Sequence, residues 1–121
     1  MSLPRIVDGD TIRLYENDQE ILSIQESVEG GKVLVALKGE LRSSTVHDLQ
    51  DELVALTTVG MELAVDLSGV TYLSNAAQHA FLLVQQRIDA MGKSGLTLVK
   101  LPAPILREFE KTGLSELLMI E

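Results

Sequence analysis

Apolar and polar residues alternate over residues 21–28, which is typical of a β-strand with one buried face. Gly30-Gly31 then supplies the positive φ angles of a tight reversal. The run at 33–37 is apolar on both faces, so a strand there belongs in the interior of a sheet. These segments predict a β-hairpin, and the buried face of its first strand is expected to carry Leu22, Ile24 and Val28, with Ser23, Gln25 and Ser27 opposite.

The period lengthens to that of a helix after residue 42. Ser43, Ser44 or Thr45 can cap the start of this helix, and Gly60 lies just past its expected end. A continuous apolar run follows at 63–67, the pattern of a buried parallel strand. The buried stripe of the helix is expected to consist of Val46, Leu49, Leu53 and Leu56.

The segment after "SGVTYLSN" has a second helical period, which Gly92 ends. Beyond it, 96–101 is a predicted strand, Pro104 opens a third helix that Gly113 closes, and 117–120 is a last short strand. In the second helix the expected buried stripe is Ala77, Ala80, Phe81, Val84 and Ile88, and the expected solvent face is Gln85, Gln86, Arg87 and Asp89.

The elements follow the order β-β-α-β-α-β-α-β. This order predicts a single α/β domain with a mixed, mostly parallel sheet, an N-terminal hairpin and about three helices packed against it. We place the domain at residues 20–121 and treat residues 1–19 as an N-terminal extension. Because Ile12 and Leu14 alternate with polar residues, the extension can hold an extra strand.

The charge and composition of the chain exclude some classes of binding partner. The chain has 18 acidic and 10 basic residues, a net charge of −8, so it would be repelled by nucleic acid and by anionic lipid. It contains no cysteine, which excludes disulfides and thiolate metal sites. No apolar run approaches the roughly 18 residues of a membrane span. These features favour a cytoplasmic protein whose partners are proteins or small molecules.

The chain lacks the motifs of common enzymes. Ser74 has no flanking glycines to form a nucleophile elbow. Gly30-Gly31-Lys32 lies between two predicted strands, which is typical of a turn and not of a phosphate-binding loop. The two histidines, His47 and His79, are too few for a metal site and are expected on helix surfaces, the first able to pair with Asp51. We therefore predict no catalytic residue, no metal and no cofactor. The acidic pairs Asp51-Glu52 and Glu108/Glu110 are expected to be solvated helix faces.

Two polar positions remain open to more than one interpretation. Asp66 follows a buried strand, where it can line a ligand crevice or, as we favour, accept hydrogen bonds from turn amides. Asn75 is a good helix cap, but the start of a helix also suits a phosphate. For Asn75 the residues alone do not decide between these roles, and we take capping of the second helix as the expectation.

Four segments, "VLVALKGELRSSTVHDLQDEL", "LAVDLSGVTYLSNAAQHAFLLV", "GKSGLTLVK" and "EFEKTGLSELLMI", together resemble the STAS domain of sulfate transporters and anti-sigma factor antagonists. The most specific stretches are Gly39-Glu40-Leu41, Asp66 to Val70, and Gly113-Leu114. The resemblance covers residues 20–121. It implies a small α/β domain that binds protein partners and has no enzymatic activity.

In bacterial members of that family, an anti-sigma factor that is also a serine kinase phosphorylates a serine at the start of the second helix. The family's Asp-Ser-[Ser/Ala]-Gly pattern falls here on Ser74, Asn75, Ala76 and Ala77. The acceptor hydroxyl is therefore replaced by the amide of Asn75. Ser74, one residue away, is the best remaining candidate acceptor, ahead of Thr71 and Ser68.

The resemblance leads to two hypotheses. The first is a binding module of a partner-switching system, similar to an anti-sigma factor antagonist, with an anti-sigma factor, serine kinase or related signalling protein as partner. The second is a constitutive structural subunit of a sensory or lipid-transport complex. In the first, the expected partner-binding residues are Arg42, Ser43, Ser44, Ser74, Asn75, Ala76, Ala77 and Gln78.

Overall fold

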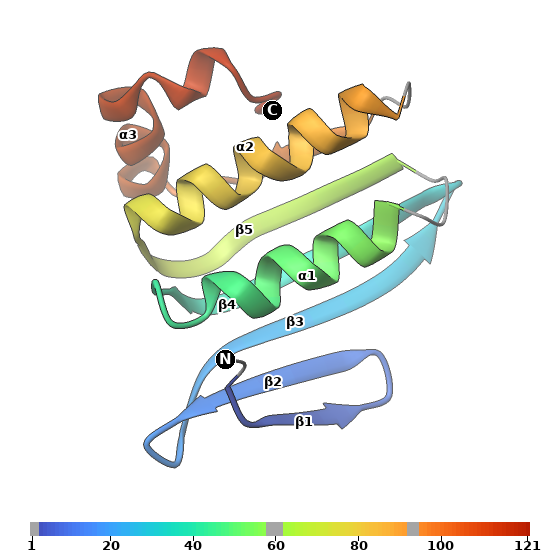
Figure 1. Ribbon diagram of the computed structural model, residues 1–121, viewed down its shortest axis with the longest axis vertical. Coiled ribbons are helices and arrows are strands. Elements are labelled where there is room, and N and C mark those ends of the chain that lie inside the picture. Colours follow the sequence, from blue (N-terminus) through green and yellow to red (C-terminus); the bar gives the residue numbers. More distant parts are fainter. Residues whose placement is uncertain (1–2, 58–61, 92–94) are drawn as a thin grey trace.

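In the described residues, six strands form a single sheet, and their order across the sheet is their order in the sequence (Figure 1). The computed structural model describes residues 3–57, 62–91 and 95–121. β1 to β4 are antiparallel neighbours, whereas β4, β5 and β6 are parallel. The strands are β1 (Arg5–Asp8), β2 (Thr11–Glu16), β3 (Gln19–Glu29), β4 (Lys32–Leu41), β5 (Glu62–Leu73) and β6 (Leu96–Val99).

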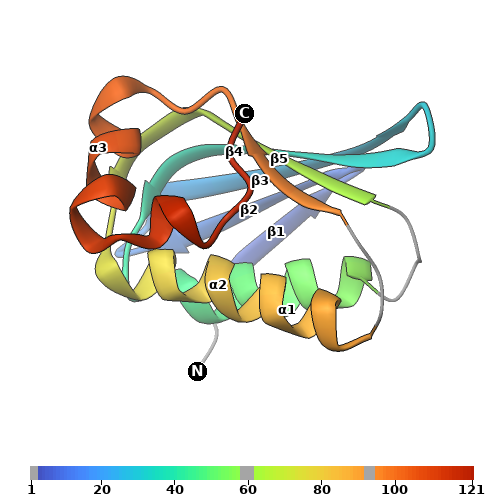
Figure 2. The same ribbon diagram turned by 90° about the horizontal axis from the view of Figure 1, so that it is seen from above.

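The helices follow the parallel strands, as the sequence predicts. α1 (Val46–Thr57) connects β4 to β5, and α2 (Asn75–Ala90) connects β5 to β6. Figure 2 shows these two helices side by side on one face of the sheet. α3 (Ala103–Thr112) lies at one end of the sheet, beside the start of α2 (Figure 1). The predicted α/β class and mixed sheet are confirmed.

The antiparallel part of the sheet is larger than expected because the N-terminal extension forms two strands. Ile12 and Leu14 of β2 are buried, and Leu14 is fully so. They pair with β3 and join the same apolar core as the helices. The strand β1 outside them is exposed along its whole length. β2 is thus an integral strand of the sheet, and its residues Ile12 and Leu14 belong to the core.

The predicted helical stripes form the core. Leu49 and Leu53 of α1 are fully buried, whereas Val46 and Leu56 are only partly buried and pack against the core. All five stripe residues of α2 are buried, and the ring of Phe81 lies 6.2 Å from that of Phe109 in α3. Gln85, expected in solvent, is 9% exposed and donates to Asp89. Its position beside the stripe allows its long side chain to lie along the core with only its end polar.

The β3–β4 hairpin turns at Gly30-Gly31, both at positive φ, as predicted. Its end projects past the helices (Figure 2), so Val28 is 67% exposed although its period places it with Leu22 and Ile24. Strand periodicity assigns a face to Val28, but burial also requires a helix to cover that face. The prediction that Val28 is buried is therefore wrong.

Three predicted boundaries change. β5 runs on to Leu73, well past the predicted end at residue 67, and β6 ends at Val99. The predicted strand at 117–120 is replaced by a 3-10 turn, Leu114–Glu116, and one bridge between Leu98 and Ile120. Gly113, at φ 80°, ends α3 as predicted, whereas Gly60 and Gly92 lie outside the described residues.

No helix in the described part of the chain is long and apolar enough to cross a membrane.

Candidate functional site at the start of α2

The carboxyl ends of β4 and β5 lie side by side, with Leu41 paired to Leu73. The N–H of Ser74 donates to the carbonyl of Leu41 at 2.9 Å, which holds the start of α2 against the turn that leads into α1. The tertiary structure thus brings the predicted residues 42–44 together with Ser74. They share a hollow of about 450 Å³ lined by Glu16, Glu40, Arg42, Ser43, Ser44, Tyr72 and Ser74.

Ser74, and not Asn75, caps α2. The Oγ of Ser74 accepts a hydrogen bond from the N–H of Ala77 at 3.1 Å, and Ser74 has an extended backbone. Asn75 is the first residue of the helix, and its carbonyl contacts the Nδ1 of His79 at 2.9 Å. The expectation that Asn75 is the cap is therefore wrong by one residue, because β5 extends directly to Leu73 and fixes where the helix begins.

Only the first part of the predicted α2 surface is accessible. Asn75 and Ala76 are exposed, whereas Ala77 and Gln78 are fully buried. The Oε1 of Gln78 accepts from the hydroxyl of Thr112 at 2.7 Å, which ties the start of α2 to the end of α3. The side chains of Ala77 and Gln78 cannot contact a partner directly, because they belong to the packing beneath the surface.

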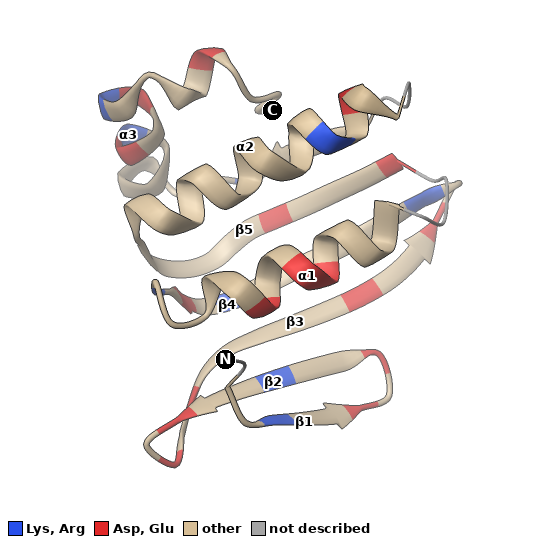
Figure 3. Cartoon of the chain, in the orientation of Figure 1, with Lys and Arg blue, Asp and Glu red and all other residues tan. Residues whose placement is uncertain are grey.

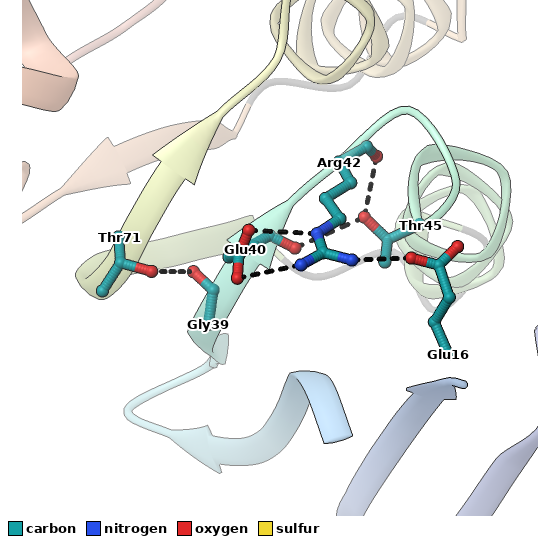
Figure 4. A network of polar contacts seen from close by, with 6 residues as sticks. All are labelled: Glu16, Gly39, Glu40, Arg42, Thr45 and Thr71. Carbon is teal, nitrogen blue, oxygen red and sulfur yellow. Dashed lines mark hydrogen bonds and ion pairs between the residues drawn. The ribbon is translucent and has the colours of Figure 1, made fainter. Parts of the chain in front are cut away.

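Arg42 is held by two carboxylates (Figure 4). Its Nε and Nη2 donate to the two oxygens of Glu40 at 3.0 and 3.2 Å, and its Nη1 donates to Glu16 at 2.7 Å. The hydrogen bonds that the guanidinium donates to Glu40 and Glu16 raise its pKa, so Arg42 stays charged. The hollow nevertheless carries two carboxylates for one cation, so its net charge is negative.

Tyr72 is a surface residue that the sequence did not single out. It is 51% exposed and borders the hollow beside Arg42. It also lines a second hollow of about 340 Å³, between the start of α2 and Pro104 and Glu108 of α3. The available signal was its place in the alternation of β5, but this appears only once the strand is known to reach Leu73.

The remaining candidate acceptors, Thr71 and Ser68, lie within β5. The hydroxyl of Thr71 is exposed and donates to the carbonyl of Gly39 at 3.3 Å. Ser68 is exposed, and its N–H donates to Asp66 Oδ1 at 2.8 Å. Asp66 therefore accepts from a nearby backbone amide, the role favoured from the sequence, and its other oxygen lies 3.8 Å from Lys100 Nζ.

The histidines are surface residues. His47 Nε2 lies 3.1 Å from Asp51 Oδ2, as predicted, and both side chains are more than half exposed. Within the described ranges, no group of three or more His, Cys, Asp or Glu side chains is arranged so that it could hold a metal ion. Figure 3 likewise shows no face of the coloured elements on which lysine and arginine gather.

Glu52, expected on a solvated face of α1, instead contacts Glu26 of β3. Burial, a hydrogen bond with Glu52 and the negative charges of Glu52 and Asp10 raise the pKa of Glu26 to about 8. Glu52 is thus part of a contact between α1 and β3, and is not a freely solvated side chain. The sequence gives no sign of this contact, because the three carboxyl groups come from separate elements.

A family model described as "Mlab, STAS domain" matches residues 24–121. Among curated proteins, none matches the chain in sequence.

Several solved structures share the fold. An anti-sigma factor antagonist from Mycobacterium paratuberculosis has a TM-score of 0.75 at 20% identity, over 88% of this chain and 89% of its own. The anti-sigma factor antagonist SpoIIAA in its unphosphorylated form has a TM-score of 0.67 at 15% identity, over 81% and 87%. A variant of RsbS from Moorella thermoacetica has a TM-score of 0.66 at 16% identity, over 81% and 85%. At identities this low, the structural similarity shows a common fold and nothing further.

Proposed function

The chain belongs to the STAS-domain family, and on that premise we propose that it is a protein-binding module of a partner-switching system, without catalytic activity of its own. Its partner is an anti-sigma factor, a serine kinase or a related signalling protein. The observation that supports this most is the contact of Ser74 with Leu41, which makes one surface from the start of α2 and the turn before α1.

The proposed surface consists of the accessible residues at this contact. From the start of α2 it takes Ser74, Asn75 and Ala76, and from the turn it takes Arg42 and Ser43; Ser44 lines the same hollow but is half-buried, with its hydroxyl oxygen buried. Asn75 presents a neutral amide to the solvent where the family's acceptor serine would stand. Such a surface corresponds to the unmodified, binding-competent state of a switch, because it carries no phosphate charge.

A charge placed at residue 75 tests this proposal. Asn75→Asp adds one negative charge at the first position of α2, where an acid favours the helix and the fold is preserved. We expect affinity for the anti-sigma factor or kinase encoded beside this gene, measured by calorimetry, to fall by roughly tenfold or more. Gln86→Glu adds the same charge to an exposed position farther along α2 and should have no effect. Equal affinities for both variants would contradict the proposed surface.

Ser74 is the proposed acceptor if a switch operates here. A phosphate on its oxygen would lie at the start of α2, where N–H groups favour an anion. Incubation with the neighbouring kinase and ATP, followed by mass mapping, should place phosphate on Ser74 and not on Thr71 or Ser68. Ser74→Ala should abolish the modification.

The lack of a hydroxyl at Asn75 also favours a second candidate function, a constitutive subunit of a sensory or lipid-transport complex. It predicts stable partner binding with no phosphate on any residue. Neighbouring genes for a sigma factor and kinase favour the first function, whereas transporter or chemoreceptor genes favour the second.

A further inference from the structure

The β1–β2 hairpin contacts the α1 end of the proposed surface at two points. Glu16, at the end of β2, accepts from Arg42 at 2.7 Å. Arg5, in β1, donates to Asp48 in the first turn of α1 at 3.0 Å. The two ion pairs have opposite polarity and lie on either side of the turn at residues 43–45. The hairpin therefore holds this turn from both sides.

The second contact satisfies a buried charge. Asp48 is 1% exposed, and its other oxygen accepts from the backbone N–H of Leu3 at 3.1 Å. A buried carboxylate is stable only when it is paired and hydrogen-bonded. Leu3 and Arg5, which bind the two oxygens of Asp48, both come from the N-terminal segment, so the position of that segment on α1 is strongly favoured.

The position of Arg42 is transmitted directly into the turn. The N–H and the hydroxyl of Thr45 both donate to the carbonyl of Arg42, at 3.0 and 2.8 Å (Figure 4 shows the hydroxyl). Thr45 is fully buried, and its own carbonyl accepts from Leu49 in α1. Holding Arg42 therefore holds the backbone that presents Ser43 and Ser44.

We infer that the N-terminal hairpin is a working part of the partner-binding surface: it supplies Glu16 to the hollow beside Ser74 and fixes the turn at residues 43–45. This rests on the proposed function. The family model begins at residue 24, so the hairpin lies outside the segment that the model matches. The hairpin then adapts a common domain to this protein's own partner.

The chemistry of the hollow indicates which partner group it fits. Glu16 and Glu40 outnumber Arg42, and Tyr72 borders the same hollow with its ring half-exposed. Carboxylates beside an aromatic ring attract a cation. The partner is therefore a protein that presents a lysine or arginine to this hollow.

The hold on the turn is tested without any partner, by amide hydrogen exchange on the whole chain. In Glu16→Gln and Arg5→Gln, exchange at Thr45 and Leu49 should become faster by about fivefold. The control Arg13→Gln breaks the ion pair of Arg13 with Glu20, in the same hairpin and 39% exposed like Arg5, and should leave both amides unchanged. Exchange at Val65 in β5 serves as the measure of global stability. Rates in Glu16→Gln equal to those in Arg13→Gln would overturn the inference.

The contribution to binding is tested on the partner used above. Glu16→Lys should weaken the affinity by roughly tenfold or more and reduce its salt dependence. Glu20→Lys makes the same charge change at the start of β3, the strand that pairs with β2, but outside the hollow, and should bind like the unaltered chain. Equal affinities for the two variants would overturn the inference even if the partner binds. Failure of every form to bind would instead count against the proposed function, while the exchange rates still decide whether the hairpin holds the turn.

Discussion

At the scale of single residues, the start of α2 depends on one hydroxyl. The oxygen of Ser74 satisfies the N–H of Ala77, which would otherwise lack a partner within the helix. Asn75, immediately next to it, has a side chain of the same capping type but lies inside the helix. The difference follows from the backbone, since only Ser74 has the extended conformation that directs its side chain toward the first turn.

Loss of this cap should have a measurable cost. Ser74→Ala is expected to lower the free energy of unfolding by about 1 kcal/mol in chemical denaturation. Asn75→Ala is the control and should change it by less than roughly 0.5 kcal/mol, because its side chain caps nothing. A larger loss for Asn75→Ala than for Ser74→Ala would show that the cap has been assigned to the wrong residue.

At the scale of elements, β2 joins the N-terminal extension to the core. Leu14 is fully buried and faces the helices together with Leu22 of β3. Ile6 in β1 is equally apolar but 54% exposed, because β1 lies at the edge of the sheet. The extension therefore contributes apolar side chains to the core through its second strand, whereas its first strand contributes the ion pair of Arg5 with Asp48.

Side-chain truncations at Leu14 and Ile6 should distinguish the contributions of β2 and β1 to the free energy of unfolding. Leu14→Ala is expected to destabilise the fold by about 2–4 kcal/mol, since it leaves a cavity in the core. Ile6→Ala should change the free energy of unfolding by less than roughly 0.5 kcal/mol. Thermal and chemical denaturation measure both. If Leu14→Ala behaved like Ile6→Ala, the extension would not be part of the cooperative fold.

At the scale of the whole molecule, Glu26 and Glu52 connect the sheet to the helical layer. The pKa of Glu26 lies at about 8 in the folded protein, against an ordinary value of 4.5, chiefly because of burial. Between these values the folded chain holds a proton that the unfolded chain releases. The stability that this provides is present in full below the ordinary value and is lost as the pH rises through about 8.

Glu26→Gln should remove this dependence. The free energy of unfolding of the variant is expected to increase relative to that of the unaltered chain as the pH rises. Near pH 9 the variant should be more stable by roughly 1 kcal/mol, after allowance for solvent screening. Denaturation midpoints over this range provide the measurement. Glu29→Gln, at the exposed end of the same strand, is the control and should leave the slope unchanged. A slope in Glu26→Gln equal to that of the unaltered chain would contradict the assigned pKa.

Elements whose signal is local could be predicted from the amino-acid sequence. The periods of α1 and α2, the reversal at Gly30-Gly31 and the end of α3 at Gly113 each depend on neighbouring residues, and all are confirmed. The family resemblance and the region around Ser74 also came from contiguous motifs. The position of the cap was wrong by one residue because the length of β5 is set by its pairing with β4, which lies far away in the sequence.

Contacts between side chains that are far apart in the sequence are determined by the tertiary structure. The contacts of Glu16 with Arg42, Arg5 with Asp48 and Glu26 with Glu52 join residues 26 to 43 positions apart, and no periodicity encodes them. Burial of Gln78 and exposure of Val28 likewise depend on whether another element covers a given face. Local pattern fixes the conformation of a segment, whereas the surface that a partner meets is fixed by the packing of segments against one another.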